Sequence, residues 1–492
     1  MPNGGGGGNS ISRAASKVVV SATVSLGAET GKNLGTILQL RRSQSHQIVA
    51  AVGVPQFYNH YVRNNTRMLH VHGRTANEDA FTVQELGEPR NDYPRYHVFA
   101  FDGELIDGTN REVYDADEDE WVPLPNPWHG ATFDSGEQIN YAQRIDGEVY
   151  LSTDKGLFYD GVRIVSHPGS TYRSSNGASL VYDGLLFANW DDGTLRVYEW
   201  TPGGAVGSPI NSFSLISGHF IRAFGILDGT VYAVSGYGRF IRYDRGLNTW
   251  SYVTQPESVA EFYCLMGMFN KLRLGDYPNG HMWDYASGGS LSRLSSYPPV
   301  ESGASSLNRE VQAAALYGGD EICHTWPWGV VHRRDMATGT WYDQRLYTAP
   351  SVSTAEAPYI GSFGHNKWGQ RLPCAALFRD GVVISAAPKD GNLLDTDYAS
   401  VPNRSEYGKV WMLRRPHAFS CELDWKSGNT VITLEISAEG IVLRQDDVEL
   451  GRVDGFAPSD FEGDDAITVE FGDGLYGPLD ADLIGHTIDQ QF

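Results

Sequence analysis

Hydrophobic and polar positions alternate along most of this chain in short runs that glycine-containing turns separate. Residues 226–253 show the pattern most fully. A tight Asp228-Gly229 turn is followed by two β-branched or aromatic runs, Thr230–Val234 and Phe240–Tyr243. After a polar turn, Trp250 begins another run. Short runs of this composition, divided by turn residues, predict a four-stranded antiparallel unit.

The same pattern returns about every 40 residues, a period typical of repeat folds. Further Asp-Gly turns occur at Asp102-Gly103, Asp146-Gly147, Asp183-Gly184 and Asp380-Gly381. A tryptophan follows a tyrosine by seven residues at Tyr114 and Trp121 and again at Tyr243 and Trp250. Arg334 takes the tyrosine position before Trp341. This arrangement resembles the kelch repeat over roughly residues 90–345, and the resemblance implies a β-propeller.

The repeat predicts about seven blades. Six begin near residues 97, 141, 178, 222, 264 and 311. A seventh is expected to use Ala375–Ile384 and Lys409–Leu413. An open ring would leave sheet edges unpaired, so N-terminal strands are expected to complete or close it. The candidates are Thr36–Leu40, Gln47–Val52 and Met68–Val71.

The two ends of the chain have sequence patterns that differ from the repeat. Glycines fill positions 4–8, and residues 1–33 are predicted to form a Gly-rich arm. From about Pro416 the sequence reads as consecutive hairpins. The expected fold is therefore all-β: a kelch-like β-propeller of four-stranded blades over 34–415, followed by a small C-terminal β-sandwich over 416–492. The 56 glycines and 12% aromatic residues agree with many short strands and tight turns.

Charge and cysteine spacing exclude several classes of function. The net charge of −22 argues against a nucleic-acid partner, because a phosphate backbone requires clustered Lys and Arg. The longest apolar runs are too short for membrane insertion. Four widely spaced cysteines, with no CxxC, predict no zinc site, and no cofactor is expected. The N-terminus lacks the charged and apolar regions of a signal peptide, so export by that route is not expected.

Two similar loops between second and third strands carry the predicted ligand-binding residues. One carries Tyr277 and His281, and the other carries His324, Trp326 and Trp328. Exposed aromatic rings stack on sugar faces, so a glycan is the candidate ligand. The alternative is that these rings pack between blades. His70 and His72 share one strand face but have no identifiable third ligand, so no metal site is assigned.

No constellation of residues specifies a reaction. No GxSxG, HExxH or phosphate-binding loop is present, and no catalytic residue is named. The favoured hypothesis is a non-enzymatic virion protein, a phage tail, fibre or spike component that forms a homo-oligomer and binds other virion or surface proteins or a surface glycan. One alternative is a carbohydrate-active lyase or hydrolase, and another is a cytosolic kelch-type adaptor. The expected location is the virion, with extracellular or cytoplasmic alternatives.

Overall fold

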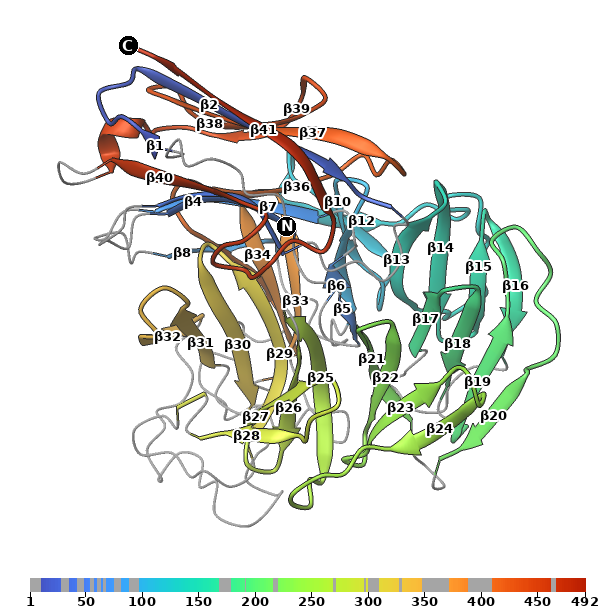
Figure 1. Cartoon of the computed structure of the whole chain (residues 1–492). Coiled ribbons are helices and arrows are strands. Elements are labelled where there is room, and N and C mark those ends of the chain that lie inside the picture. Colours follow the sequence, from blue (N-terminus) through green and yellow to red (C-terminus); the bar gives the residue numbers. More distant parts are fainter. Residues whose placement is uncertain are drawn as a thin grey trace, which may run out of the picture.

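The chain forms a ring of small antiparallel sheets with two larger sheets against one side (Figure 1). This computed structural model describes a defined set of residues. They are 10–27, 35–41, 48–53, 57–59, 63–64, 68–74, 81–87, 97–167, 178–190, 192–215, 220–268, 271–295, 298–299, 309–326, 330–346, 371–387, 409–461 and 466–492. None of the described residues forms a helix long and apolar enough to cross a membrane.

Six blades follow one another along the chain, each made of four antiparallel strands. Blades one to three are β9 (Val98–Phe101), β10 (Glu104–Asp107), β11 (Glu112–Asp115) and β12 (Glu120–Pro123); β13 (Ile139–Ile145), β14 (Glu148–Thr153), β15 (Gly156–Tyr159) and β16 (Val162–Ser166); and β17 (Ala178–Tyr182), β18 (Leu185–Asn189), β19 (Thr194–Glu199) and β20 (Asn211–Ser214). Blades four to six are β21 (Ile221–Leu227), β22 (Thr230–Ser235), β23 (Phe240–Asp244) and β24 (Thr249–Tyr252); β25 (Glu261–Met268), β26 (Lys271–Tyr277), β27 (Met282–Ala286) and β28 (Ser292–Leu294); and β29 (Glu310–Tyr317), β30 (Asp320–Trp326), β31 (Val330–Asp335) and β32 (Trp341–Arg345). These repeated sheets make the fold an all-β propeller, as predicted.

The Asp-Gly turns and the tryptophans occur at the positions that the repeat predicted. Asp102 and Gly103 have φ angles of 49° and 77°, the positive values that a two-residue type I′ hairpin turn requires. Asp146, Asp183 and Asp228 have the same geometry. At Asp380-Gly381 the positive φ lies one residue earlier, at Arg379.

The two residues of each Tyr–Trp pair are cross-strand partners. Tyr243 pairs with Trp250 between β23 and β24, and the ring centroids are 5.1 Å apart. Tyr114 and Trp121 repeat this contact at 5.5 Å. The seven-residue spacing therefore joins the third and fourth strands of a blade through an aromatic pair.

The seventh blade is closed by a strand from near the start of the chain. Its strands β33 (Arg371–Phe378), β34 (Gly381–Ala387) and β35 (Val410–Arg414) lie where the sequence predicted. The fourth strand is β8 (Thr82–Glu85), which pairs with β35. The three N-terminal segments expected to complete this blade belong to another sheet. That part of the prediction is wrong, because these segments pair with one another and with residues 418–422 near the other end of the chain.

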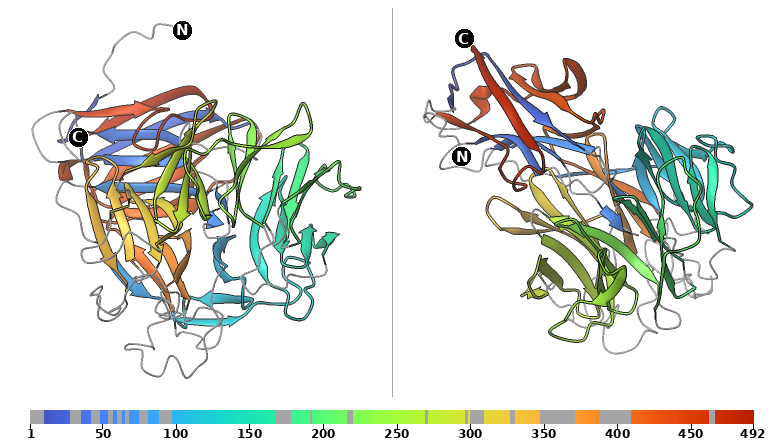
Figure 2. Two further views of the ribbon diagram at one scale, coloured as in Figure 1. Left: turned by 90° about the horizontal axis from the view of Figure 1, so that it is seen from below. Right: turned by 45° about the vertical axis from the view of Figure 1, so that its right-hand side comes forward.

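Two sheets, here called the terminal sheets, combine the first and last residues of the chain. The six-stranded sheet has the order β1 (Ser10–Ile11), β40 (Ile467–Phe471), β3 (Gly35–Arg41), β4 (Ile48–Gly53), β7 (Met68–Arg74) and β36 (Ala418–Glu422). The five-stranded sheet has the order β39 (Val448–Val453), β38 (Gly440–Gln445), β37 (Asn429–Ser437), β2 (Lys17–Ser25) and β41 (Asp482–Gln491). Figure 2 shows the blue N-terminal and red C-terminal strands side by side in both views.

The terminal sheets share one apolar core. Alternate residues of β2, including Val18 and Val20, are fully buried against Leu38 and Leu434. Strand pairing therefore differs from the predicted division of the chain. Part of the arm assigned to 1–33 is the strand β2, which pairs with β37, and the strands β3 and β7 within 34–74 pair with the C-terminal strands β40 and β36.

A short hairpin from the six-stranded sheet enters the centre of the ring. The first strands of neighbouring blades contact one another around this centre. The strand β5 (Phe57–Asn59) pairs with the free inner edge of β21 and also contacts β17 and β25. Its partner β6 (Arg63–Asn64) contacts β9 and β33. The protein's own backbone therefore occupies the middle of the ring, the usual position of a propeller channel.

Buried polar groups join the terminal sheets to blade six. The backbone amide of Gly318 donates to His70 Nε2 over 2.7 Å, and that of Gly319 donates to the Tyr476 hydroxyl over 2.8 Å. Arg74 of β7 donates to Asp335 Oδ2 over 2.5 Å. These contacts fix the position of the terminal sheets on the propeller face that carries the Asp-Gly turns.

Candidate functional site

A groove between blades three and four combines an apolar floor with charged side chains at its rim. It consists of two adjoining hollows with volumes of about 240 and 600 Å³. Both are lined by Leu185 of β18, Tyr243 of β23 and Arg245 in the turn after β23. The walls therefore come from two neighbouring blades, and the packing of these blades brings them together.

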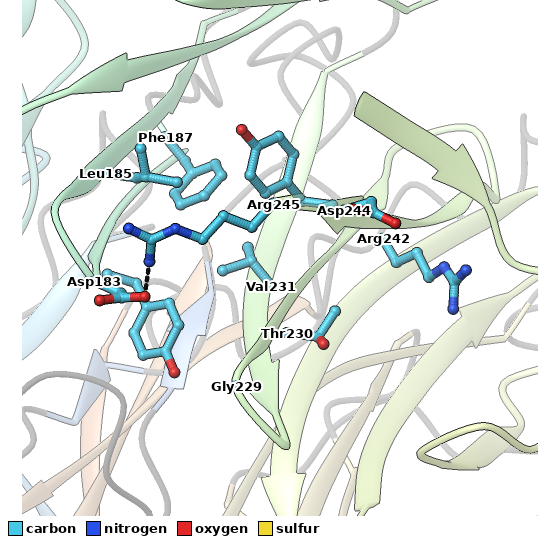
Figure 3. A pocket seen from close by; sticks show the side chains of 11 residues that line it. Asp183, Leu185, Phe187, Gly229, Thr230, Val231, Arg242, Asp244 and Arg245 are labelled. Carbon is cyan, nitrogen blue, oxygen red and sulfur yellow. Dashed lines mark ion pairs between the residues drawn. The ribbon is translucent and has the colours of Figure 1, made fainter. Parts of the chain in front are cut away.

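The floor of the first hollow is part of the core between the two blades. Phe187, Leu185 and Val231 are buried there. Figure 3 shows the Arg245 side chain reaching between Val231 and the pair Leu185 and Phe187 towards Asp183, with which it forms an ion pair. The side chains of Asp183 and Arg245 are 61% and 56% exposed. An ion pair this exposed adds little stability, so a ligand can replace either partner at small cost.

Tyrosine hydroxyls and amides supply uncharged hydrogen-bonding groups. The Tyr243 hydroxyl donates to Asn248 Oδ1 over 2.6 Å, and Asn248 Nδ2 donates to the Ile210 carbonyl over 3.0 Å. Burial, and secondarily the negative charge of Asp244, raises the pKa of Tyr243. Burial, and secondarily Asp480, raises the pKa of Tyr182. Both hydroxyls therefore remain protonated donors at neutral pH.

Exposed apolar residues flank the second hollow. Leu247 is 73% exposed and Ile210 is 39% exposed. Trp200 forms part of the lining, and its Nε1 donates to the Gly204 carbonyl over 2.9 Å. The groove thus offers both signs of charge, hydrogen-bonding groups and apolar contacts over a length that spans two blades, which suits binding of an extended segment.

Comparisons with known proteins show likeness of fold. Scans against protein-family models and curated proteins produced no match. Similar solved structures include a chain of the mitotic checkpoint complex, at 10% identity and TM-score 0.42, covering 69% of this chain and 95% of that chain. The RRP9 WD40 repeats match at 8% identity and TM-score 0.42, covering 68% of this chain and 100% of that chain. BamB from Moraxella catarrhalis matches at 11% identity and TM-score 0.37, covering 81% of this chain and 98% of that chain. The propeller assignment itself rests on the strand pairing described above.

The residues predicted from sequence to bind a ligand lie in blades five and six, away from the groove. Tyr277 and His281 are half-buried. His324 and Trp326 are buried, with Trp326 only 2% exposed, and Trp328 lies outside the described residues. Tyr277 and Trp326 occupy equivalent positions, opposite Glu261 and Glu310 of their first strands. A buried Trp326 ring is placed for packing and not for stacking on a sugar, and ligand binding by these residues stays a prediction.

A repeated polar cap closes the turn between the second and third strands, and sequence reasoning missed it. In each of six blades, a polar residue at or next to the end of the second strand bonds to the backbone of that turn. These residues are Asp107, Thr153, Asn189, Ser235, Asp276 and Thr325. In the first four blades the cap follows the aspartate of the Asp-Gly turn by five to seven residues, so no fixed spacing marked it in the sequence.

Asp276 shows that a perturbed pKa in this fold can belong to such a cap. Its Oδ1 accepts a hydrogen bond from the His281 amide over 2.7 Å, and its Oδ2 accepts one from Trp283 Nε1 over 2.8 Å. Burial raises the pKa of Asp276 to about 6, despite these hydrogen bonds. The bonds hold the loop from 276 to 281 in place, so the shift accompanies a structural role.

Removing a cap is expected to lower stability measurably. Asp107 is fully buried, and its Oδ1 accepts amide hydrogen bonds from Thr109 and Asn110 over 3.0 and 3.2 Å. Asp107→Ala should lower the free energy of unfolding by about 1–3 kcal/mol, because it leaves buried donors unpaired. Urea unfolding measures this. Asp115→Ala is the control, because Asp115 makes a similar turn bond at a half-buried position. Equal losses in the two variants would contradict the cap's role.

His70 and His72 occupy one strand face, as the sequence indicated, but their surroundings do not suit a cation. Their rings stack with centroids 5.5 Å apart, and both residues are fully buried. Burial lowers the pKa of His70 to about 3 and that of His72 well below its usual value, with a contribution from the nearby Arg415. Within the described part of the chain, no group of three or more His, Cys, Asp or Glu residues is placed to hold a metal.

Proposed function

We propose that this chain is a non-enzymatic binding protein that holds an extended segment of a partner protein in the groove between blades three and four. The observation that carries the proposal is the exposed Arg245–Asp183 pair over an apolar floor. Charges of both signs beside Leu247 and Ile210 favour a peptide with mixed charged and apolar side chains. A neutral surface glycan would leave the rim charges unused and is the second candidate ligand.

We further propose that the protein acts in a virion, as a structural or attachment component. Two surfaces on one all-β body support this role, because the groove can bind a target while the terminal sheets hold the protein in a particle. The blades are proposed to be of kelch type, supported by the cross-strand Tyr–Trp pairs. The terminal sheets are proposed to be a β-sandwich, supported by their common apolar core.

Two measurements test location and binding. The first bands particles from the source culture on a density gradient and detects the protein with an antibody; its absence from DNA-containing particles would contradict a virion role. The second measures binding of the fluorescently labelled full chain to host cells. Arg245→Glu and Leu247→Asp should each weaken binding at least about tenfold, equivalent to 1.4 kcal/mol. Val162→Asp, at a 64% exposed position on blade two, is the matched control.

Treating the cells separates the two candidate ligands. Loss of binding after protease treatment, but not after periodate oxidation, supports a protein partner. The reverse result would identify a glycan and overturn the protein-partner proposal. Equal effects of the groove variants and Val162→Asp would show that the groove is not the binding site.

A further inference from the structure

The strand β41 forms an open edge of the five-stranded terminal sheet. It runs from Asp482 to Gln491 and, among the described strands, pairs with β2 alone. Most of its residues are exposed, including Ile484 at 57%. About every second residue of an edge strand turns its N–H and C=O groups away from its neighbour, which makes the edge a template for another strand.

The usual protections of an edge strand are weak here. The sequence of β41 is DLIGHTIDQQ, which has no Lys, Arg or Pro and only two acidic residues, Asp482 and Asp489. Its pairing with β2 has a register shift next to Val24, near its beginning, and is regular from Gly485 to Gln491. Natural edges carry charges, prolines or bulges to prevent pairing, so a long regular stretch without them is suited to an interface.

The opposite edge of the same sheet is protected. There β39 runs from Val448 to Val453, and it contains Glu449 and Arg452, which form an ion pair at 2.6 Å. Arg444 on the neighbouring strand adds a second bond to Glu449 at 3.3 Å. The two edges thus differ in charge and length, which points to β41 alone as the interacting edge.

We propose that β41 pairs antiparallel with β41 of a second copy of this chain, joining the two five-stranded sheets across a two-fold axis. Such pairing is self-complementary and closes after two chains. Residues directly opposite each other in an antiparallel pair point to the same face of the sheet. The two-fold axis therefore passes between two copies of one residue, which pairs with itself. Centred on Thr487, the pairing spans residues 485–489 of the regular stretch and sets Asp489 opposite Gly485 and His486 opposite Ile488. Neither carboxylate then faces another carboxylate.

The net charge of each copy predicts how the dimer responds to salt. Two chains of charge −22 repel one another over long distances. Salt at 0.1 M screens charges beyond about 10 Å, whereas backbone hydrogen bonds at the edge are unaffected. The dimer should therefore strengthen as ionic strength rises. This proposal is independent of the groove, so Arg245→Glu should leave dimerisation unchanged.

Analytical ultracentrifugation of the full chain tests the proposal. The wild type should sediment with twice the chain mass of 54.2 kDa. Thr487→Lys places two lysines opposite each other at the axis and should raise the dimer dissociation constant at least about tenfold. Val448→Lys, on the protected edge at a 65% exposed position, should leave it unchanged.

Cross-linking provides a second measurement in case Thr487→Lys fails to fold. Thr487→Cys should form a disulfide-linked dimer under mild oxidation, whereas Val448→Cys should not. The four native cysteines form no disulfide, and Cys264, Cys323 and Cys374 are buried. Burial also raises the pKa of Cys264 and Cys421 to about 12, so their background reactivity is low. A wild-type monomer at high protein concentration and moderate salt, an equal effect of Val448→Lys, or no Thr487→Cys cross-link would each overturn the proposal.

Discussion

Asp320→Ala is expected to lower the free energy of unfolding by about 3–5 kcal/mol, the cost of removing one partner from a buried ion network. The Asp320 carboxylate is 1% exposed and accepts from three guanidinium groups. Arg333 and Arg415 donate over 2.9 and 3.0 Å, and Arg74 donates over 3.4 Å. Without Asp320, Arg74 would keep its ion pair with Asp335, whereas Arg333 and Arg415 would each lose a carboxylate partner.

The effect should concern the joint between the terminal sheets and the propeller. Arg74 belongs to the six-stranded sheet, whereas Asp320 and Arg333 belong to blade six. Urea unfolding measures the loss, and Glu257→Ala is the control. Glu257 forms an ion pair with Arg293 in which both side chains are more than 40% exposed, so its loss should cost less than about 1 kcal/mol. A loss from Asp320→Ala as small as the control's would mean that water replaces the missing carboxylate.

Stability is expected to fall by at least about 2–3 kcal/mol as the pH is lowered from 7 to 5. Burial lowers the pKa of His70 to about 3 and that of His324 to about 4, and it holds the pKa of His72 well below 6.5. The unfolded chain takes up protons below pH 6.5 while the folded chain does not, so stability is lost as the pH falls. His70 and His324 each contribute about 2 kcal/mol over this interval, and His72 acts in the same direction. Asp276 opposes them: its raised pKa, about 6, means that the folded chain gains a proton first, which restores about 1 kcal/mol.

Two substitutions separate these contributions, because they act with opposite sign. Neither His72 Nδ1 nor Nε2 has a hydrogen-bond partner. His72→Leu should therefore raise stability at pH 7 by about 1 kcal/mol and reduce the loss between pH 7 and 5. Asp276→Asn should enlarge that loss by about 1 kcal/mol. Urea unfolding at both pH values provides the measurement. A pH dependence unchanged in both variants would exclude these side chains as its source.

The sequence predicts the blades well because their signals are local. The Asp228-Gly229 turn, the strand Thr230–Val234 and Trp250 all lie within one hairpin pair, and the structure confirms each of them. The closing strand gave no such signal. Thr82–Glu85 is a short outer strand with its first two residues exposed, so it lacks the alternation that marks a half-buried strand.

The strand β2 is the reverse case, because its own sequence predicts a strand but does not predict its partners. Lys17–Ser25 alternates between buried and half-buried positions as a strand with one face in a core should. What its sequence does not contain is the position of its partners, β37 and β41, which lie about 400 residues further along the chain. Strand pairing over such separations depends on the completed core and not on local propensity.

The candidate groove could not be predicted for a related reason. Asp183 and Arg245 lie in turns of two neighbouring blades and meet only when those blades pack together. The aromatic residues singled out from the sequence, such as Trp326, have the composition of a sugar platform. Their burial depends on neighbouring blades, which the sequence of one loop does not specify.

The pairing of the first strands with the last affects how the protein forms during its synthesis. The strands β2, β7 and β8 emerge from the ribosome early, but their partners β41, β36 and β35 emerge only after the first six blades. Meanwhile the apolar face of β2 has no core to enter, and such a segment invites aggregation or chaperone binding. The blades can form one by one as they emerge, whereas the terminal sheets and the closure of the ring await the end of translation.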